Sequence, residues 1–224
     1  MQRTLSSIIA GASFVAGALV LAAAPSHAAG MQDEVDQATA IIERFREMPE
    51  EGIPEKVLKD AKGLAILTVL KAGFIFSGQG GWGVVVAKTP NGWSAPSAIG
   101  TGGAGFGFQV GGQVTEFVLV LNTPEAVDAF ARGGNVSFGG ALSAAAGPVG
   151  RTAGASVMPV AAVYTYSRSQ GLFAGASIEG TVIAARDEAN RGYYGRDVTP
   201  KEILSGQVKA PRGAEKLKAA LGKL

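Results

Sequence analysis

The chain has 224 residues, of which 47% are hydrophobic and only 17% charged, and its formal net charge is +2. This length fits one domain, or two at most, and so much apolar content excludes a disordered chain. A general nucleic-acid-binding protein would need a stronger basic excess. Cysteine is absent and His27 is the single histidine, which excludes disulfides, cysteine nucleophiles and cysteine-ligated metals.

Residues 1–28 have the pattern of an export signal peptide. Arg3 supplies a short positive start, an uncharged apolar run extends from Ile8 to Ala24, and Ser26-His27-Ala28 fits the small-x-small cleavage pattern. We expect cleavage after Ala28, with a retained membrane anchor as the alternative. The mature chain would then lack both histidine and cysteine, which excludes Ser-His-Asp, Cys-His and His-ligated zinc chemistry. Such a protein would be periplasmic or secreted, and peripheral to the membrane.

The first part of the mature chain predicts two helices. Apolar residues recur with helical spacing over Asp33–Met48, and the acidic residues near its start favour a helix N-terminus. Pro49 and Gly52 end this helix. Pro54 suits a first helical position, so we expect a short second helix that stops at Gly63.

From Leu64 onwards the pattern is typical of strands. We expect strands at Leu64–Phe76, Val84–Val86, Phe106–Gln113, Val114–Asn122, Asn135–Ala146, Met158–Ser167 and Leu172–Ala185. Asn91-Gly92 indicates a tight turn between two of them. Glycine is unusually frequent, at 33 residues in the whole chain. Within strands it marks bends or close backbone approaches, which suits a strongly coiled sheet or a small barrel.

Short helices are expected to alternate with and follow the later strands, at Thr123–Ala131, Asp187–Tyr194, Thr199–Gly206 and Ala214–Leu221. The predicted fold class is therefore α+β: a Gly-rich, mostly antiparallel curved sheet or small barrel flanked by N- and C-terminal helices. We expect residues 29–224 to form a single domain, with a core at 32–206 and a basic C-terminal helix at 207–224.

Patterns that could carry chemistry or span a membrane have simpler structural explanations. Gly78–Gly83 matches G-x-G-x-x-G, but the strand Val84–Val86 follows where a dinucleotide site needs a helix. Asp187 and Glu188 could be a catalytic carboxylate pair, but their arginine neighbours favour a solvated helix start. An outer-membrane barrel would need more strands and aromatic girdles. We therefore expect no enzyme, no metal and no cofactor.

Isolated charges are the more informative candidates for a binding site. Lys71 and Arg168 lie in apolar surroundings, where a charge is normally paired or kept for function. For Arg168 the alternatives are an internal pair, for instance with Glu116 or Glu179, a loop position at a strand end, and a phosphate site with neighbouring serines and backbone amides. The basic C-terminal segment could contact an anionic surface, or could simply solvate a helix that covers the sheet.

Several segments, in order along the chain, resemble one known family. They are Ala61–Phe74, Trp93–Gly100, Phe117–Thr123, Gly147–Arg151 and Tyr164–Gly180. In these segments the chain is similar to the SYLF domain, also called the Ysc84 actin-binding domain, over about Gln32–Gly206. The resemblance implies a non-enzymatic lipid-binding module. Eukaryotic members bind phosphoinositides, partly through an N-terminal amphipathic helix, and fungal members bind and bundle actin.

The export signal and the acidic first helix depart from that family pattern, and we interpret the chain as a bacterial exported member. We expect peripheral binding of envelope phospholipids, such as phosphatidylethanolamine, phosphatidylglycerol or cardiolipin, mainly by apolar insertion and with weak salt dependence. The alternative is a protein-interaction or structural module of the periplasm, an actin-binding-like scaffold with an envelope protein partner. Nucleic acid is not an expected partner.

Candidate site residues are the basic positions within or beside these segments. The headgroup-binding candidates are Lys62, Lys71, Arg151 and Arg168, and the membrane-contact candidates are Lys209, Arg212, Lys216 and Lys218.

Overall fold

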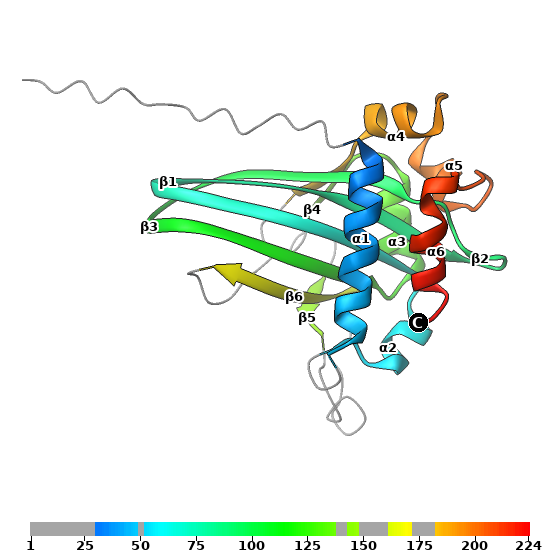
Figure 1. Cartoon of the computed structure of the whole chain (residues 1–224), viewed down its shortest axis with the longest axis horizontal. Helices are drawn as coiled ribbons and strands as arrows, with labels where there is room; N and C mark the ends of the chain where they lie inside the picture. The colour runs from blue at the N-terminus through cyan, green and yellow to red at the C-terminus, as the bar shows by residue number, and fades with distance from the viewer. Residues whose placement is uncertain (1–29, 49–51, 138–142, 148–160, 172–181) are drawn as a thin grey trace, which may run out of the picture.

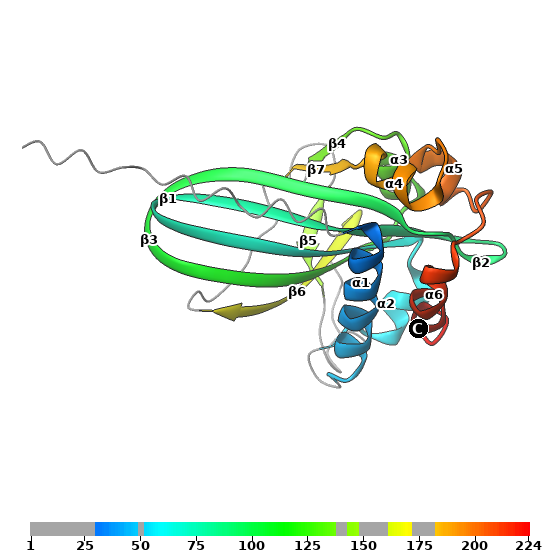
Figure 2. The ribbon, with the colours of Figure 1, turned by 45° about the horizontal axis from the view of Figure 1, so that its top comes forward.

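The computed structural model describes residues 30–48, 52–137, 143–147, 161–171 and 182–224. Their most prominent feature is a strongly curled sheet with helices gathered at one end, while the long strands extend beyond the helices at the other end (Figures 1 and 2). The predicted α+β class, with an antiparallel-rich curved sheet flanked by N- and C-terminal helices, is confirmed.

The elements follow the expected order along the chain. The helices are α1 (Met31–Arg46), α2 (Glu55–Asp60), α3 (Pro124–Ala131), α4 (Asp187–Tyr194), α5 (Pro200–Leu204) and α6 (Glu215–Leu221), with a 3-10 turn at Arg212–Ala214. The strands are β1 (Gly63–Thr89), β2 (Gly92–Trp93), β3 (Ser97–Leu121), β4 (Asn135–Ser137), β5 (Ala144–Ala146), β6 (Val163–Gly171) and β7 (Val182–Ala185).

Two long strands, β1 and β3, form the framework of the sheet. They pair antiparallel from Gly63↔Leu121 to Val85↔Ser97, and the register shifts between Phe74 and Phe76. Figures 1 and 2 show each strand curving back at the far end of the sheet. The two halves of β1 therefore lie side by side, and the Lys88 N–H donates to the Lys62 carbonyl at 2.8 Å.

Several strand predictions differ from the structure in their limits. The strands expected at 106–113 and 114–122 are parts of the single strand β3, because Gly111 and Gly112 continue the ladder with β1 instead of interrupting it. The strand expected at 135–146 is represented by β4 and β5. Of the strand expected at 172–185, only β7 falls within the described residues.

The sheet order is β2-β1-β3-β6-β5, with β7 paired to β3 and to β4. All these pairs are antiparallel except β5 with β6. Hydrophobic clusters lie on both faces of the sheet near the helices: Leu64 and Ile66 pack with α1, α2 and α6, whereas Ala65 and Leu67 pack with α3. Because both faces are covered there, the strands have continuous apolar runs instead of alternating ones.

Helix α1 is fastened to the rest of the molecule by polar contacts near both of its ends. Near its start, Glu34 is only 2% exposed and forms an ion pair with Arg186, next to the start of α4. Near its end, Arg44 donates two hydrogen bonds to Glu116 of β3, at 2.6 and 3.1 Å. The apolar side of α1 is buried between these contacts.

Helices α4 and α6 are also docked by specific hydrogen bonds. The fully buried Asn190 of α4 accepts from the Ala98 N–H at 2.8 Å and donates to the Ser97 hydroxyl at 3.2 Å. The Trp93 indole, on β2, donates to the Leu221 carbonyl of α6 at 3.0 Å.

The turn before β2 occupies Pro90-Asn91, and Gly92 takes a positive φ of 99°, so the turn lies one residue earlier than predicted.

Replacement of Gly83 by alanine should destabilise the fold. A Cβ at Gly83 would lie 2.0 Å from the Ile66 carbonyl oxygen and 2.5 Å from the Leu67 Cα, both backbone atoms of the other half of β1. We expect Gly83→Ala to lower the free energy of unfolding by about 1–3 kcal/mol or more, measured by urea unfolding. Gly102→Ala is the matched control, since no heavy atom lies within 4 Å of its Cβ position. Equal stability of the two variants would contradict this close approach.

The stability contribution of Glu34 should depend on pH. Burial raises the pKa of Glu34 above its ordinary value of 4.5, outweighing the opposing effect of Arg186. The native state therefore binds more protons than the unfolded state between these two pKa values, so this contribution falls as pH rises through that window. Glu34→Gln cannot ionise, and its stability relative to the wild type should increase from pH 4.5 upwards.

Urea unfolding of the wild type and of Glu34→Gln at a series of pH values measures this difference. Glu125→Gln, at an exposed position in the first turn of α3, is the control for loss of one acid. A difference between Glu34→Gln and the wild type that does not change with pH would sink the prediction.

Candidate functional site

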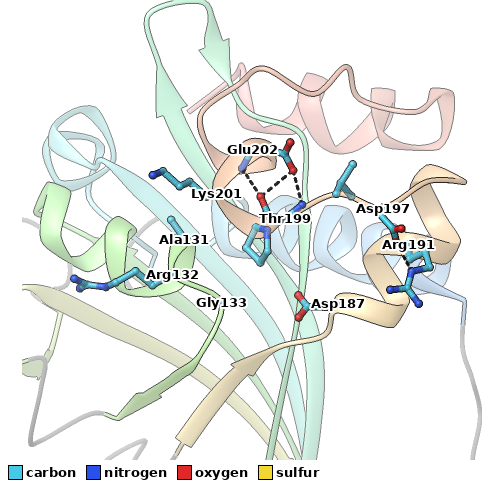
Figure 3. Close-up of a pocket in the computed structure, with 11 residues that line it drawn as sticks. Ala131, Arg132, Gly133, Asp187, Arg191, Asp197, Thr199, Lys201 and Glu202 are labelled. Atoms are coloured by element: carbon cyan, nitrogen blue, oxygen red, sulfur yellow. Dashed lines mark hydrogen bonds and ion pairs between the residues drawn. The ribbon is translucent and has the colours of Figure 1, made fainter.

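A groove of about 800 Å³ lies at the helical end of the molecule, between α3, α4 and α5 (Figure 3). It is lined by Ala131, Arg132, Gly133, Asp187, Arg191, Asp197, Val198, Thr199, Pro200, Lys201 and Glu202. The end of α3, the start of α4 and the segment leading into α5 therefore meet at one surface although they are distant in sequence.

Local sequence signals hold the walls of this groove. Thr199 and Glu202 form a capping box at the start of α5, in which the Thr199 N–H donates to Glu202 at 2.7 Å and the Glu202 N–H donates to the Thr199 hydroxyl at 3.2 Å. These hydrogen bonds hold the pKa of Glu202 below its ordinary value. Gly133 has a positive φ of 65° after α3 and faces Pro200, so the chain turns away from α3 beside α5.

The groove presents charges of both signs. Arg191 pairs with Asp197, and Glu202 is occupied by the capping box. Among the described residues, no salt bridge involves Arg132, Lys201 or Asp187, and all three are exposed. Figure 3 shows Arg132 and Lys201 on the same side of the groove, with Asp187 below its centre. This arrangement can form ion pairs with a bound partner.

The described residues provide no site for a metal ion. They contain no group of three or more histidine, cysteine, aspartate or glutamate side chains that could hold one. The G-x-G-x-x-G pattern at Gly78–Gly83 lies inside β1, so it does not form a phosphate-binding turn before a helix. Asp187 and Glu188 are exposed in the first turn of α4, as expected for a solvated helix start.

The predicted headgroup-binding residues do not converge in the structure. Lys62 immediately precedes β1, whereas Lys71 lies farther along that strand, at the end away from the helices. Lys71 also lies on the sheet face opposite to Arg168, because side chains alternate along a strand and α1 covers the Arg168 face. Arg151 lies outside the described residues.

Arg168 belongs to a charge cluster instead. It pairs with Glu116 at 3.7 Å, and Glu116 also accepts the two hydrogen bonds from Arg44 of α1. The internal pair considered from the sequence is therefore present, with Glu116 as the partner. Glu179, the other partner considered, lies outside the described residues.

The predicted membrane-contact residues are exposed at the C-terminal end. Lys209, Arg212, Lys216 and Lys218 all point to solvent, while Leu217 and Leu221 of α6 are buried in the cluster that contains α1. The apolar side of α6 is thus part of the core. In the part of the chain that the structure describes, no helix is both long enough and apolar enough to cross a membrane.

Sequence reasoning did not identify Arg132 and Lys201 as site residues. Neither residue stands in an apolar run or a binding motif; Lys201 is an interior position of the Thr199–Glu202 capping box, which serves the helix start. The two residues line one groove only because α3 and α5 pack together. Their only sequence signal is indirect: each lies at a predicted helix boundary, where side chains are commonly exposed.

Comparison with protein families shows which family the chain is similar to. A family described as "Ysc84: Las17-binding protein actin regulator" matches residues 102–224, which is more than half of the chain and includes every residue of the groove. The sequence resemblance to the Ysc84, or SYLF, family is therefore confirmed.

Individual relatives come from yeasts and mammals. Protein YSC84 of Saccharomyces cerevisiae is 55% identical over 170 residues, covering 74% of this chain and 36% of that protein. LAS seventeen-binding protein 3 of S. cerevisiae is 54% identical over the same length, covering 74% and 37%. SH3 domain-containing YSC84-like protein 1 of Homo sapiens is 46% identical over 195 residues, covering 84% and 57%. The chain thus spans about a third to just over half of the length of these relatives.

The predicted periplasmic or secreted localisation is wrong. The relatives are yeast and mammalian proteins, and the family is described by binding to Las17 and by actin regulation, not by a role in a bacterial envelope. Assignment to a bacterial exported member is likewise unsupported. The error came from interpreting the apolar N-terminal pattern by itself; residues 1–28, with the expected cleavage after Ala28, lie outside the described residues.

Proposed function

The chain belongs to the Ysc84 family of Las17-binding actin regulators, and from this membership we propose that it is a non-enzymatic interaction module whose partner is a protein of the actin machinery. The groove between α3, α4 and α5 is the proposed contact site. The observation that carries this proposal is the pair of exposed cations, Arg132 and Lys201, on one side of a groove that lies wholly within the family-matched segment.

The charge pattern of the groove supports a protein partner. Asp187 is exposed near the two cations, so the surface is not uniformly basic. Interfaces between proteins commonly combine complementary charges of both signs, which set orientation and association rate. A polyanion would instead be repelled by Asp187 and by the ionised Glu202.

Phospholipid binding is a second candidate, supported by the exposed basic residues Lys209, Arg212, Lys216 and Lys218. Both terminal helices bury their apolar sides, α1 along its length and α6 at Leu217 and Leu221. In this docked position, the side chains that these helices can present to a bilayer are charged and not apolar. Binding through the C-terminal segment would therefore be electrostatic and salt-sensitive, in contrast to the apolar insertion expected from the sequence.

Reversal of both groove cations should weaken binding to the protein partner. We expect Arg132→Glu combined with Lys201→Glu to raise the Kd at least about tenfold, because rim ion pairs become repulsions. The measurement is binding of the full chain to purified Las17, and co-sedimentation with actin filaments. Lys216→Glu combined with Lys218→Glu changes the net charge equally outside the groove and should leave this binding unchanged. Equal losses in the two double variants would refute the groove as the contact site.

The same two double variants also test phospholipid binding, with the roles of test variant and control exchanged. In co-sedimentation with vesicles of phosphatidylcholine containing phosphatidylserine, Lys216→Glu with Lys218→Glu should reduce binding about tenfold or more, since each basic residue near an anionic surface contributes about 1 kcal/mol. The groove variant should bind vesicles like the wild type. Binding that survives both the tail substitutions and high salt would contradict an electrostatic mechanism.

A further inference from the structure

The sheet face that α1 covers continues beyond that helix. Figures 1 and 2 show β1 and β3 extending past the helices to a free end. Under the helices, Ile66 and Val118 are register partners and are fully buried. Four residues farther out on each strand, and on the same face, Leu70 and Val114 are register partners; their exposed fractions are 45% and 40%. The apolar face therefore emerges from the core into solvent.

Leu70 and Val114 form one apolar patch. Directly opposed side chains on antiparallel strands lie about 5 Å apart at their Cβ atoms. Among the residues whose side chains the structure describes, which exclude 73–77 and 104–111, the only other large hydrophobic residue with comparable exposure is Val182, on β7.

A charge cluster borders the patch on the side towards α1. Arg44, Glu116 and Arg168 combine two cations with one anion, so the cluster has a formal charge of +1. Arg44 is hydrogen-bonded to Glu116, whereas Arg168 lies 3.7 Å from that carboxylate, beyond hydrogen-bond distance, and its side chain is 36% exposed. The Arg168 guanidinium can therefore donate hydrogen bonds to a further carboxylate.

The spacing of these two features matches an extended peptide. Val114 pairs with Gln170 of β6, so Val114 and Arg168 are diagonal neighbours on adjacent strands; such residues lie roughly 7–8 Å apart. An extended chain places side chains i and i+2 on one face at a similar separation. We propose that the open sheet face docks an extended segment of a protein partner, with an apolar side chain on Leu70 and Val114 and an acidic side chain two residues away on Arg168.

The surface favours such a peptide over a membrane. Among the residues whose side chains the structure describes, the large exposed apolar residues of this face are Leu70 and Val114. They offer little apolar area for insertion into a bilayer, and a cluster charge of +1 gives only weak attraction to an anionic surface. One apolar anchor beside one cation is complementary to one apolar and one acidic side chain. The open face shares no lining residue with the groove between α3, α4 and α5, so this proposal does not depend on the proposed function of that groove.

A pair of labelled peptides tests the proposal on the full chain. The first is a ten-residue threonine-rich peptide with Leu-Thr-Glu at its centre, and the second has lysine in place of the glutamate. By fluorescence anisotropy, the glutamate peptide should bind at least tenfold more tightly than the lysine peptide. Leu70→Ser should weaken its binding about tenfold, and Arg168→Glu should reverse the preference between the two peptides.

Matched variants separate docking from misfolding. Val182→Ser removes an equally exposed aliphatic side chain from β7 and should leave peptide binding unchanged. Circular dichroism and urea unfolding show whether each variant is folded. If Arg168→Glu does not fold because of repulsion from Glu116, Arg168→Gln is used in its place. This variant should bind the glutamate and lysine peptides equally. Equal binding of both peptides by the wild type, an equal effect of Val182→Ser, or no binding up to about 1 mM would overturn the proposal. So would a Leu70→Ser variant that loses binding to phosphatidylserine vesicles but not to the peptide.

Discussion

The close approach between the two halves of β1 is the constraint on which the rest of the architecture depends. Backbone atoms of Ile66 and Leu67 occupy the space that a side chain at Gly83 would need, so the fold-back requires glycine at that position. Through this fold-back, the apolar segments at both ends of β1 come together beneath the helices and are covered on both faces. The middle of the strand is correspondingly carried out beyond the helices, where Leu70 reaches solvent.

The docking of the terminal helices limits how the molecule can bind anything else. α1 buries its apolar side and is held by the Glu34–Arg186 and Arg44–Glu116 contacts, and α6 buries Leu217 and Leu221 against it. Insertion of either apolar side into a bilayer would therefore require separation from the core and loss of that burial, at roughly 25 cal/mol per Å² of apolar surface. Contact through exposed charges needs no such rearrangement, so the docked helices disfavour apolar insertion into a bilayer.

The sequence predicts what depends on local signals and misses what depends on distant pairing. The helices appear close to their expected positions, because apolar periodicity, the Thr199–Glu202 capping box and Pro124 at a helix start act within a few residues. The glycine content indicated strong curvature, but not that the two halves of β1 come together, since Lys62 and Lys88 give no local sign of their contact. Lys71 and Arg168 were grouped because both are isolated charges; the register that puts them on opposite faces becomes known only with the strand pairing.

The strand pairing also determines which charged residues remain accessible. Glu116 is neutralised because the register of β3 places it beside Arg168 while α1 brings Arg44 over it. In contrast, Arg132 and Lys201 at the helical end have no ion pair with any residue that the structure describes, although they share a groove with three acids. Strands β1 and β3 pair antiparallel between the two ends, with one register shift between Phe74 and Phe76, so the same sheet carries both surfaces. The groove and the open sheet face share no lining residue, so a substitution on one proposed contact surface can be tested without altering the other.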